Sequence, residues 1–192
     1  MNRLFNSFSL VCLCWSMCVT ATGQAQKKYE IDNTHSSIIF SISHFNIGFV
    51  YGRFNKVAGI VSIDEQDPAK SVFDFEIESE SVDTNDPARD EHLRGLDFLD
   101  AANYSKIEFK SESVTLSKGV YQVTGKLKLL KTERELKIPF QLLGVGPGPF
   151  GKSRMGMLGK FRIKRSEFGM TEMLTGIGDD IAITFALQGV LK

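Results

Sequence analysis

The stretch Tyr121–Leu142, YQVTGKLKLLKTERELKIPFQL, decides the fold class. Apolar residues alternate with polar ones from Tyr121 to Leu129, and again from Leu136 to Leu142. Successive side chains of a β-strand point to opposite faces, so each half predicts a strand with one buried face. The polar run Lys131–Arg134 between the halves predicts a turn, which makes the two strands an antiparallel pair.

The same alternation extends to both sides of this hairpin. Further strands are predicted over residues 37–44, 51–63, 73–78, 107–111, 155–163 and 181–190. The total is about eight long strands joined mostly by short turns, and such a meander closes on itself because closure removes exposed strand edges. The glycines Gly52 and Gly59 supply bends that a curling sheet needs. The sequence therefore predicts an all-β, eight-stranded antiparallel barrel.

The segment Asp86–Arg94 breaks the alternation. Asp86 suits the N-cap of a helix, and Pro87 suits its first position. Asp90 and Arg94 are four residues apart, a spacing that allows them to pair. We expect a short helix that caps one end of the barrel.

The first 25 residues differ from the rest of the chain. Arg3 precedes an apolar run, Leu10–Thr20, and small residues follow it. This order is typical of a signal peptide, and the run is shorter than the roughly 20 apolar residues that span a bilayer. We expect cleavage after Ala25 or Ala21, with residues 1–25 as signal peptide and residues 26–192 as a periplasmic or secreted domain that keeps no membrane span.

Two alternatives to cleavage are an uncleaved anchor and a lipoprotein acylated at Cys18. Residues 15–17 lack the small residue that usually precedes a lipidated cysteine, which argues against the lipoprotein. Removal of residues 1–25 also removes every cysteine, so the remaining domain has no disulfide available.

Composition and motifs argue against several function classes. The formal net charge is zero and no basic block occurs, so we expect no nucleic-acid partner. The three histidines, His35, His44 and His92, lack the spacing of a zinc ligand pair, and we expect no metal and no cofactor. No nucleophile, zinc-protease or phosphate-loop motif is present, which favours a protein that is not an enzyme.

The phenylalanine content bears on what the barrel holds. An eight-stranded barrel is just wide enough to be filled by side chains or to hold one small ligand. Thirteen of the 15 phenylalanines lie after residue 25. They either fill the core or, with Met and Leu, line a tunnel for a chain-like lipid.

Particular residues give the chain a recognisable signature. They are Asp32, His35-Ser36, Phe40, Ile42, His44, Gly52-Arg53-Phe54, Ser81-Val82-Asp83-Thr84, Arg89-Asp90, His92-Leu93-Arg94 and Asp97-Phe98-Leu99. In these residues the chain resembles the YceI-like family from about residue 29 to residue 191. The resemblance implies a lipocalin-like barrel with a helical cap, secreted or periplasmic, that binds polyisoprenoids, isoprenoid quinones or fatty-acid derivatives.

The leading hypothesis is thus an exported carrier that holds a long apolar lipid, of isoprenoid type, in the barrel interior. The alternatives are an enzyme acting on such a lipid with His44 or His92 as acid or base, and a stress-related envelope protein with a protein partner. A homodimer is compatible with all three. The candidate ligand-binding residues are Phe40, Ile42, His44, Phe54, Phe73, Phe75, Ile77, Arg89, His92, Phe98, Phe109, Leu127, Phe140, Phe161 and Phe185.

Basic residues are the candidates for a polar mouth of the barrel. Arg89 and His92 can donate to a lipid head group, although Arg89 can equally pair with a nearby aspartate. Arg94 is expected to pair with Asp83, Asp86 or Asp90 and to fix the cap. Arg165 is expected to be structural, and His35 to hydrogen-bond its turn. His44 shares a face with Phe40 and Ile42, where it is either a satisfied core residue or a ligand contact.

Overall fold

The computed structural model describes residues 26–192, so the predicted signal peptide lies outside the described residues. The described part forms one α-helix, α1 (Pro87–Arg94), and a single sheet. The strands are β1 (Lys27–Ile31), β2 (Ser37–His44), β3 (Gly48–Phe54), β4 (Val57–Ile63), β5 (Val72–Glu78), β6 (Val82–Asp83), β7 (Lys106–Ser117), β8 (Val120–Leu129), β9 (Thr132–Pro147), β10 (Ser153–Lys164) and β11 (Ile177–Leu191). Among residues 26–192, no helix is long and apolar enough to cross a membrane.

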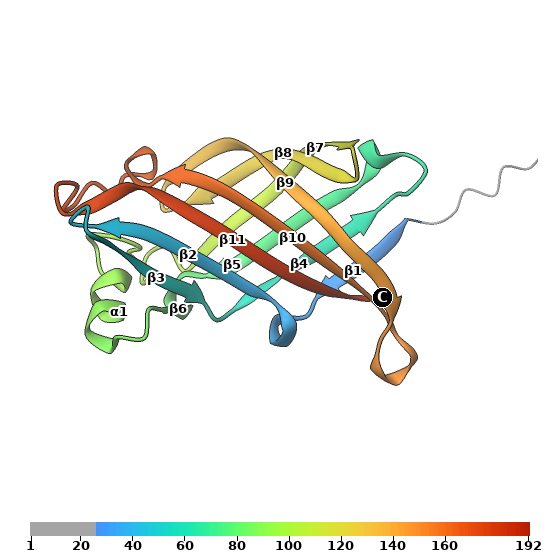
Figure 1. Ribbon diagram of the computed structural model, residues 1–192, viewed down its shortest axis with the longest axis horizontal. Helices are drawn as coiled ribbons and strands as arrows, with labels where there is room; N and C mark the ends of the chain where they lie inside the picture. The colour runs from blue at the N-terminus through green and yellow to red at the C-terminus, as the bar shows by residue number, and fades with distance from the viewer. Residues whose placement is uncertain (1–25) are drawn as a thin grey trace, which may run out of the picture.

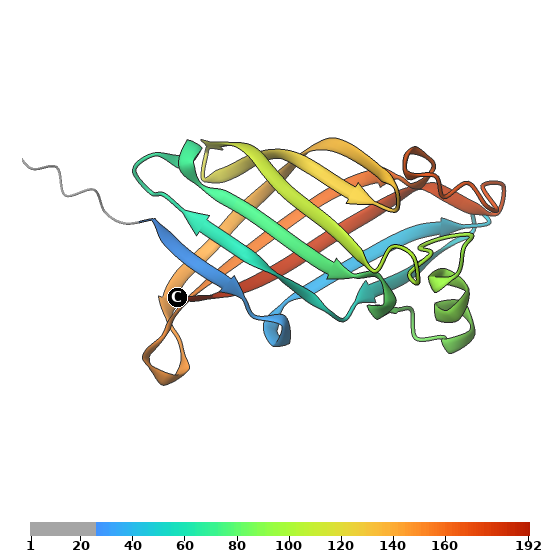
Figure 2. The same ribbon diagram turned by 180° about the vertical axis from the view of Figure 1, so that it is seen from behind.

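Eight of these strands close into an antiparallel barrel, which confirms the predicted fold class. They follow the order β1-β4-β5-β7-β8-β9-β10-β11, and the pair Tyr29↔Leu191 joins β11 back to β1. β2 pairs with a different part of β11, through Ile42↔Ile181, and β3 follows β2. The barrel is elongated (Figure 1), and the view from behind shows its closed wall of tilted strands (Figure 2).

The two ends of the barrel differ. α1, the turn between β2 and β3 and the loop before β11 lie at one end, while the C-terminus and the turn between β9 and β10 lie at the other (Figure 1). We call the first the α1 end. The sequence therefore predicted correctly that a short helix lies at one end of the barrel.

The structure corrects several predicted strand boundaries. The predicted strand 51–63 is two strands, because β3 pairs with β2 whereas β4 pairs with β1 and β5. The predicted turn at Lys131–Arg134 is tighter, because Thr132 already pairs with Leu129. The strand predicted to end at Leu142 is longer, since β9 continues to Pro147 and pairs there with Ser153.

Asp32 links the junction of β1 and β2 to the neighbouring strands β10 and β11. Its carboxylate accepts hydrogen bonds from Arg154 Nη1 at 2.6 Å, from His35 Nδ1 at 2.7 Å and from the backbone N–H of Thr34 at 3.0 Å. Its own N–H donates to the Gln188 carbonyl at 2.9 Å. The bond to Arg154 and then that to His35 lower the pKa of Asp32 to about 2. His35 thus bonds its turn as predicted.

Hydrogen bonds to preceding residues anchor α1. The buried Asp90 accepts from Thr84, at 2.8 Å from its N–H and 2.6 Å from its Oγ1. Arg94 donates to the carbonyls of Glu80 and Val82 at 2.8 and 3.0 Å. Asp86 caps the helix as predicted, accepting from the second and third helical N–H groups.

The predicted partners of Asp90 and Arg94 are therefore wrong. These two residues do not bond each other, and Arg94 bonds no aspartate within the described chain. Groups just before the helix lie closer to each of them, so both side chains attach the helix to the segment 80–84, which contains β6. β6 in turn pairs with β3 through Phe54↔Val82.

Substitution Asp32→Asn is expected to lower stability at pH 7 by up to about 2 kcal/mol. A depressed pKa in the folded state means that the ionised carboxylate contributes stability above pH ~4, and this contribution is lost as the pH falls toward ~2. The wild-type protein should therefore lose more stability between pH 4 and 2 than the variant. Urea unfolding midpoints across this range measure the difference.

Asp67→Asn is the matched control, because Asp67 also caps a short 3-10 turn by accepting from Ala69 N–H but binds no arginine. It should keep the wild-type acid slope. Equal slopes for wild type and Asp32→Asn would contradict the role assigned to the Arg154 bond.

Substitution Asp90→Ala is expected to detach α1 without opening the barrel. It leaves the buried N–H of Thr84 without its acceptor, at a cost of about 1–3 kcal/mol. Hydrogen exchange should accelerate in residues 84–100 and stay unchanged in β8 and β9. Glu91→Ala, at the next and exposed position, is the control and should leave exchange unchanged; equal effects of both substitutions would refute this anchoring.

Candidate functional site

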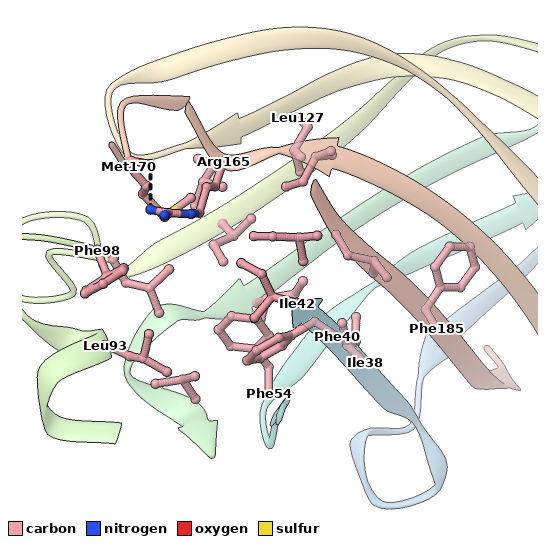
Figure 3. A pocket seen from close by; sticks show the side chains of 18 of the residues that line it. Ile38, Phe40, Ile42, Phe54, Leu93, Phe98, Leu127, Arg165, Met170 and Phe185 are labelled. Carbon is pink, nitrogen blue, oxygen red and sulfur yellow. Dashed lines mark hydrogen bonds between the residues drawn. The ribbon is translucent and has the colours of Figure 1, made fainter. Parts of the chain in front are cut away.

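The barrel is hollow at its α1 end. A cavity of about 510 Å³ lies there, within the ~300–1,000 Å³ typical of ligand pockets. Its wall is formed by side chains from the barrel strands, from α1 and from the loops beside it (Figure 3). The lining side chains His92 and Met173 are about half exposed, so the cavity reaches the surface at this end.

The other half of the barrel is filled by its own side chains. Tyr29, Val61, Phe73, Val123 and Met157 are at most 1% exposed and do not line the cavity. Phenylalanines were expected either to fill the core or to line a tunnel. The first interpretation describes this half of the barrel, and the second describes the half at the α1 end. The boundary lies where the Phe140 ring stands 4.8 Å from that of Phe73 and 4.5 Å from that of Phe185.

The structure brings the candidate residues together around this cavity, with one exception. All of the side chains named from the sequence line it except Phe73. Phe73 packs against Phe140 and Tyr121 in the filled half. It shares its inward face with Phe75, but β5 runs toward the α1 end, so Phe75 lies by the cavity and Phe73 does not.

Sequence reasoning missed many of the apolar lining residues. They are Ile38, Val50, Val82, Ala88, Leu93, Leu99, Ile107, Leu129, Ile138, Ile163, Met170, Met173, Ile177, Ile181, Ile183 and Leu187. Half of them occupy inward positions of predicted strands, so the alternation itself was the signal for these. Met170 and Met173 belong to the loop before β11, where no periodicity marks an inward side chain.

Arg165 is the largest fully buried side chain of the described chain, and it lines the cavity. Its guanidinium donates to the carbonyls of Gly178 at 2.9 Å, Met170 at 2.9 Å and Ile177 at 3.0 Å. These bonds hold the loop before β11, so Arg165 is structural as expected. Burial lowers the pKa of the guanidinium, and the carboxylates of Asp179 and Glu172 oppose that shift.

Arg89 and His92 lie on the cavity side of α1. Arg89 donates from Nε to Thr84 Oγ1 at 2.8 Å and from Nη2 to the Thr84 carbonyl at 2.9 Å, so its partner is not one of the aspartates considered. His92 packs edge-on against Phe98, with ring centres 5.0 Å apart, and its Nε2 lies 3.6 Å from Asp97.

His44 stands at the rim of the cavity, at the end of β2. It is exposed, and its ring lies 4.5 Å from that of Phe45. Of the two alternatives for His44, the buried core residue is therefore wrong, because β2 reaches the barrel mouth at this position. Among residues 26–192, no three His, Asp or Glu side chains gather as a metal site would require.

Comparison with solved structures finds the same fold. The crystal structure of BcnA from Burkholderia cenocepacia superposes with a TM-score of 0.75 at 23% identity, covering 82% of this chain and 98% of that one. The YceI protein of Campylobacter jejuni gives 0.68 at 26% identity, covering 78% and 90%. A polyisoprenoid-binding domain from Saccharophagus degradans gives 0.67 at 19% identity, covering 85% and 98%.

Comparison of sequences finds relatives of similar length. A UPF0312 protein of Pectobacterium atrosepticum is 32% identical over 166 residues, which are 86% of each chain. A UPF0312 protein of Vibrio parahaemolyticus is 34% identical over 173 residues, 88% of this chain and 90% of that one. The model of the YceI-like domain matches residues 29–189. With its barrel, helical cap and these matches, the chain belongs to the YceI-like domain family.

Proposed function

We propose that this protein is an exported carrier that holds a long apolar lipid of isoprenoid type in the hollow half of its barrel. The main observation in support is the cavity of about 510 Å³, which is lined almost entirely by apolar side chains and reaches the surface at the α1 end. The structural likeness to the polyisoprenoid-binding domain of Saccharophagus degradans supports the ligand class. Export is proposed from residues 1–25, whose sequence has the order of a signal peptide.

The chemistry of the cavity wall accounts for affinity for apolar lipids and for tolerance of differences between them. Each buried CH₂ contributes about 0.8 kcal/mol, so each five-carbon isoprene unit contributes up to about 4 kcal/mol before the costs of association. The aliphatic and aromatic side chains of the wall do not specify a hydrogen-bonding pattern along the chain of the ligand. Such a wall selects for apolar character and length rather than for one particular molecule.

A tryptophan reporter tests lipid entry into the cavity. Residues 26–192 contain no tryptophan, and Phe161 is a partly buried lining residue whose ring centre lies 6.1 Å from that of Phe185. In the variant Phe161→Trp of the delipidated protein, geranylgeraniol should shift the emission to shorter wavelength in a saturable titration. The cause is exclusion of water from around the indole by the bound lipid.

Tyr51→Trp is the matched control, since Tyr51 is 65% exposed and does not line the cavity. Its emission should not change. The proposal fails when geranylgeraniol leaves the emission of Phe161→Trp unchanged, or when it shifts both variants alike. As an independent test of the proposal, native mass spectrometry of the protein purified from its own host should show a co-purifying lipid and give its mass.

One observation favours a protein partner in addition, namely a second copy of this chain. Over Gly48–Gly52, β3 pairs with β2 alone among the described strands, and the outward side chains Phe49 and Tyr51 are 67% and 65% exposed. An apolar strand with a free edge is a template for pairing with another strand. We propose a homodimer through β3.

A charge on this edge should abolish that dimer. Analytical ultracentrifugation is expected to show wild-type dimers and Phe49→Lys monomers, because a charged side chain blocks edge-to-edge pairing. Lys128→Glu, on the outer face of β8, is a control for altered charge and should stay dimeric. A monomeric wild-type protein would overturn the homodimer and leave the lipid cavity unaffected.

A further inference from the structure

The polar side chains that line the cavity are all basic. They are His44, Arg89, His92 and Arg165, and no Asp or Glu within residues 26–192 belongs to the wall. The domain itself carries no excess of positive charge, because its Lys and Arg nearly balance its Asp and Glu. The predominance of basic side chains is therefore a property of the cavity wall and not of the composition of the domain.

These four basic side chains lie together at the α1 end. Arg89 and His92 are one helical turn apart on α1. The Phe98 ring joins His92 to Arg165, since the Arg165 guanidinium lies 5.9 Å from its centre and the His92 ring 5.0 Å. Ile177 joins Arg165 to His44, because it accepts from Arg165 Nη2 and pairs with His44 across the sheet.

The charge of Arg165 is incompletely compensated inside the protein. The side chain belongs to a residue that is 1% exposed, yet no carboxylate of the described residues lies within 4.0 Å of it. The carboxylates of Asp179 and Glu172 act on the guanidinium, and Asp179 is itself bonded to the N–H and hydroxyl of Ser166. A buried cation beside an apolar cavity is costly unless it is paired.

Arg165 and Arg89 each have N–H groups beyond those used in the hydrogen bonds described above. A guanidinium has five N–H groups. Arg165 uses one on each nitrogen for the three carbonyls, which leaves two, on Nη1 and Nη2. Arg89 uses Nε and one N–H of Nη2, which leaves three. Geometrically fixed arginines with spare donors are suited to the oxygens of phosphate and carboxylate.

We propose that this basic end of the cavity binds the head group of an anionic lipid, a phosphate monoester or a carboxylate, while the apolar tail extends along the wall toward Phe185. Arg89 contacts the head group at the mouth, and Arg165 supplies the fixed positive charge behind it. This inference rests on the proposed lipid carrier and adds the class of its head group. A neutral alcohol of the same tail would occupy the same tunnel with fewer hydrogen bonds.

Two ligands that share one tail but differ in head group distinguish binding of the head group from binding of the tail in the cavity. Geranylgeranyl phosphate and geranylgeraniol are titrated into the delipidated Phe161→Trp protein. Because charge-assisted hydrogen bonds are stronger than neutral ones, the phosphate is expected to bind about tenfold more tightly or better. The additional substitution Arg89→Gln should remove most of that preference and leave the affinity for the alcohol within about twofold.

Arg162→Gln is the matched control, since Arg162 lies on β10 at an exposed position outside the cavity wall. It removes the same charge and should preserve the preference for the phosphate. Equal loss in both variants would show that net charge alone is responsible and would overturn the site. Arg165→Lys, which keeps the charge but not the fork of donors, should weaken the phosphate more than the alcohol, with the far-ultraviolet circular dichroism spectrum as the check on folding.

The remaining outcomes separate this inference from the proposed function. Binding of the alcohol with an affinity equal to that of the phosphate overturns the head-group site and leaves the carrier intact. Failure of both lipids to bind overturns both. Inorganic phosphate alone is titrated as well; binding as tight as that of geranylgeranyl phosphate would assign the site to free phosphate and overturn the lipid head group.

Discussion

The rest of the structure depends on the closure of eight strands, because a barrel of this size encloses a space only about one layer of side chains wide. Whether such a barrel is solid or hollow is decided locally, by the volume of the inward side chains and by how far they reach across. In the half around Tyr29 and Phe73 the aromatic rings meet and exclude everything else. Toward the α1 end the wall continues, but its inward side chains leave the cavity between them.

The helical cap follows from the same constraint. β2 and β3 continue one side of the wall beyond the place where β4 turns to pair with β1, so closure at the α1 end is incomplete. Hydrogen bonds to Thr84, Glu80 and Val82 hold α1 and its flanking residues over this gap, and Ala88 and Leu93 of the helix face the cavity. Such a short helix can open at a lower cost than a barrel strand can separate, which fits the proposed carrier.

Sequence reasoning predicted the inward faces of the strands well and their positions along the barrel axis poorly. Alternation is local, so it correctly assigns Phe73 and Phe75 to the inside. Which of them borders the cavity depends on the tilt and register of β5 against its neighbours, and these are set by contacts distant in sequence. For the same reason the split between β3 and β4 could not be predicted, since it arises from a change of partner strand.

The hydrogen-bond partners of the charged side chains were the least predictable part of the site. Charge and spacing suggested that Arg89, Arg94 and Asp90 bond each other or nearby carboxylates, whereas they bond main-chain groups and the hydroxyl of Thr84. Carbonyl groups satisfy the donors of an arginine without neutralising its charge, so the arginines that shape this end of the barrel keep their positive field. The same bonds that fix the loop before β11 therefore also leave the hollow half electrostatically biased toward an acceptor-rich ligand. In the proposed head-group site, Arg165 has both a structural and a binding role, because the three carbonyls that it binds hold its guanidinium fixed.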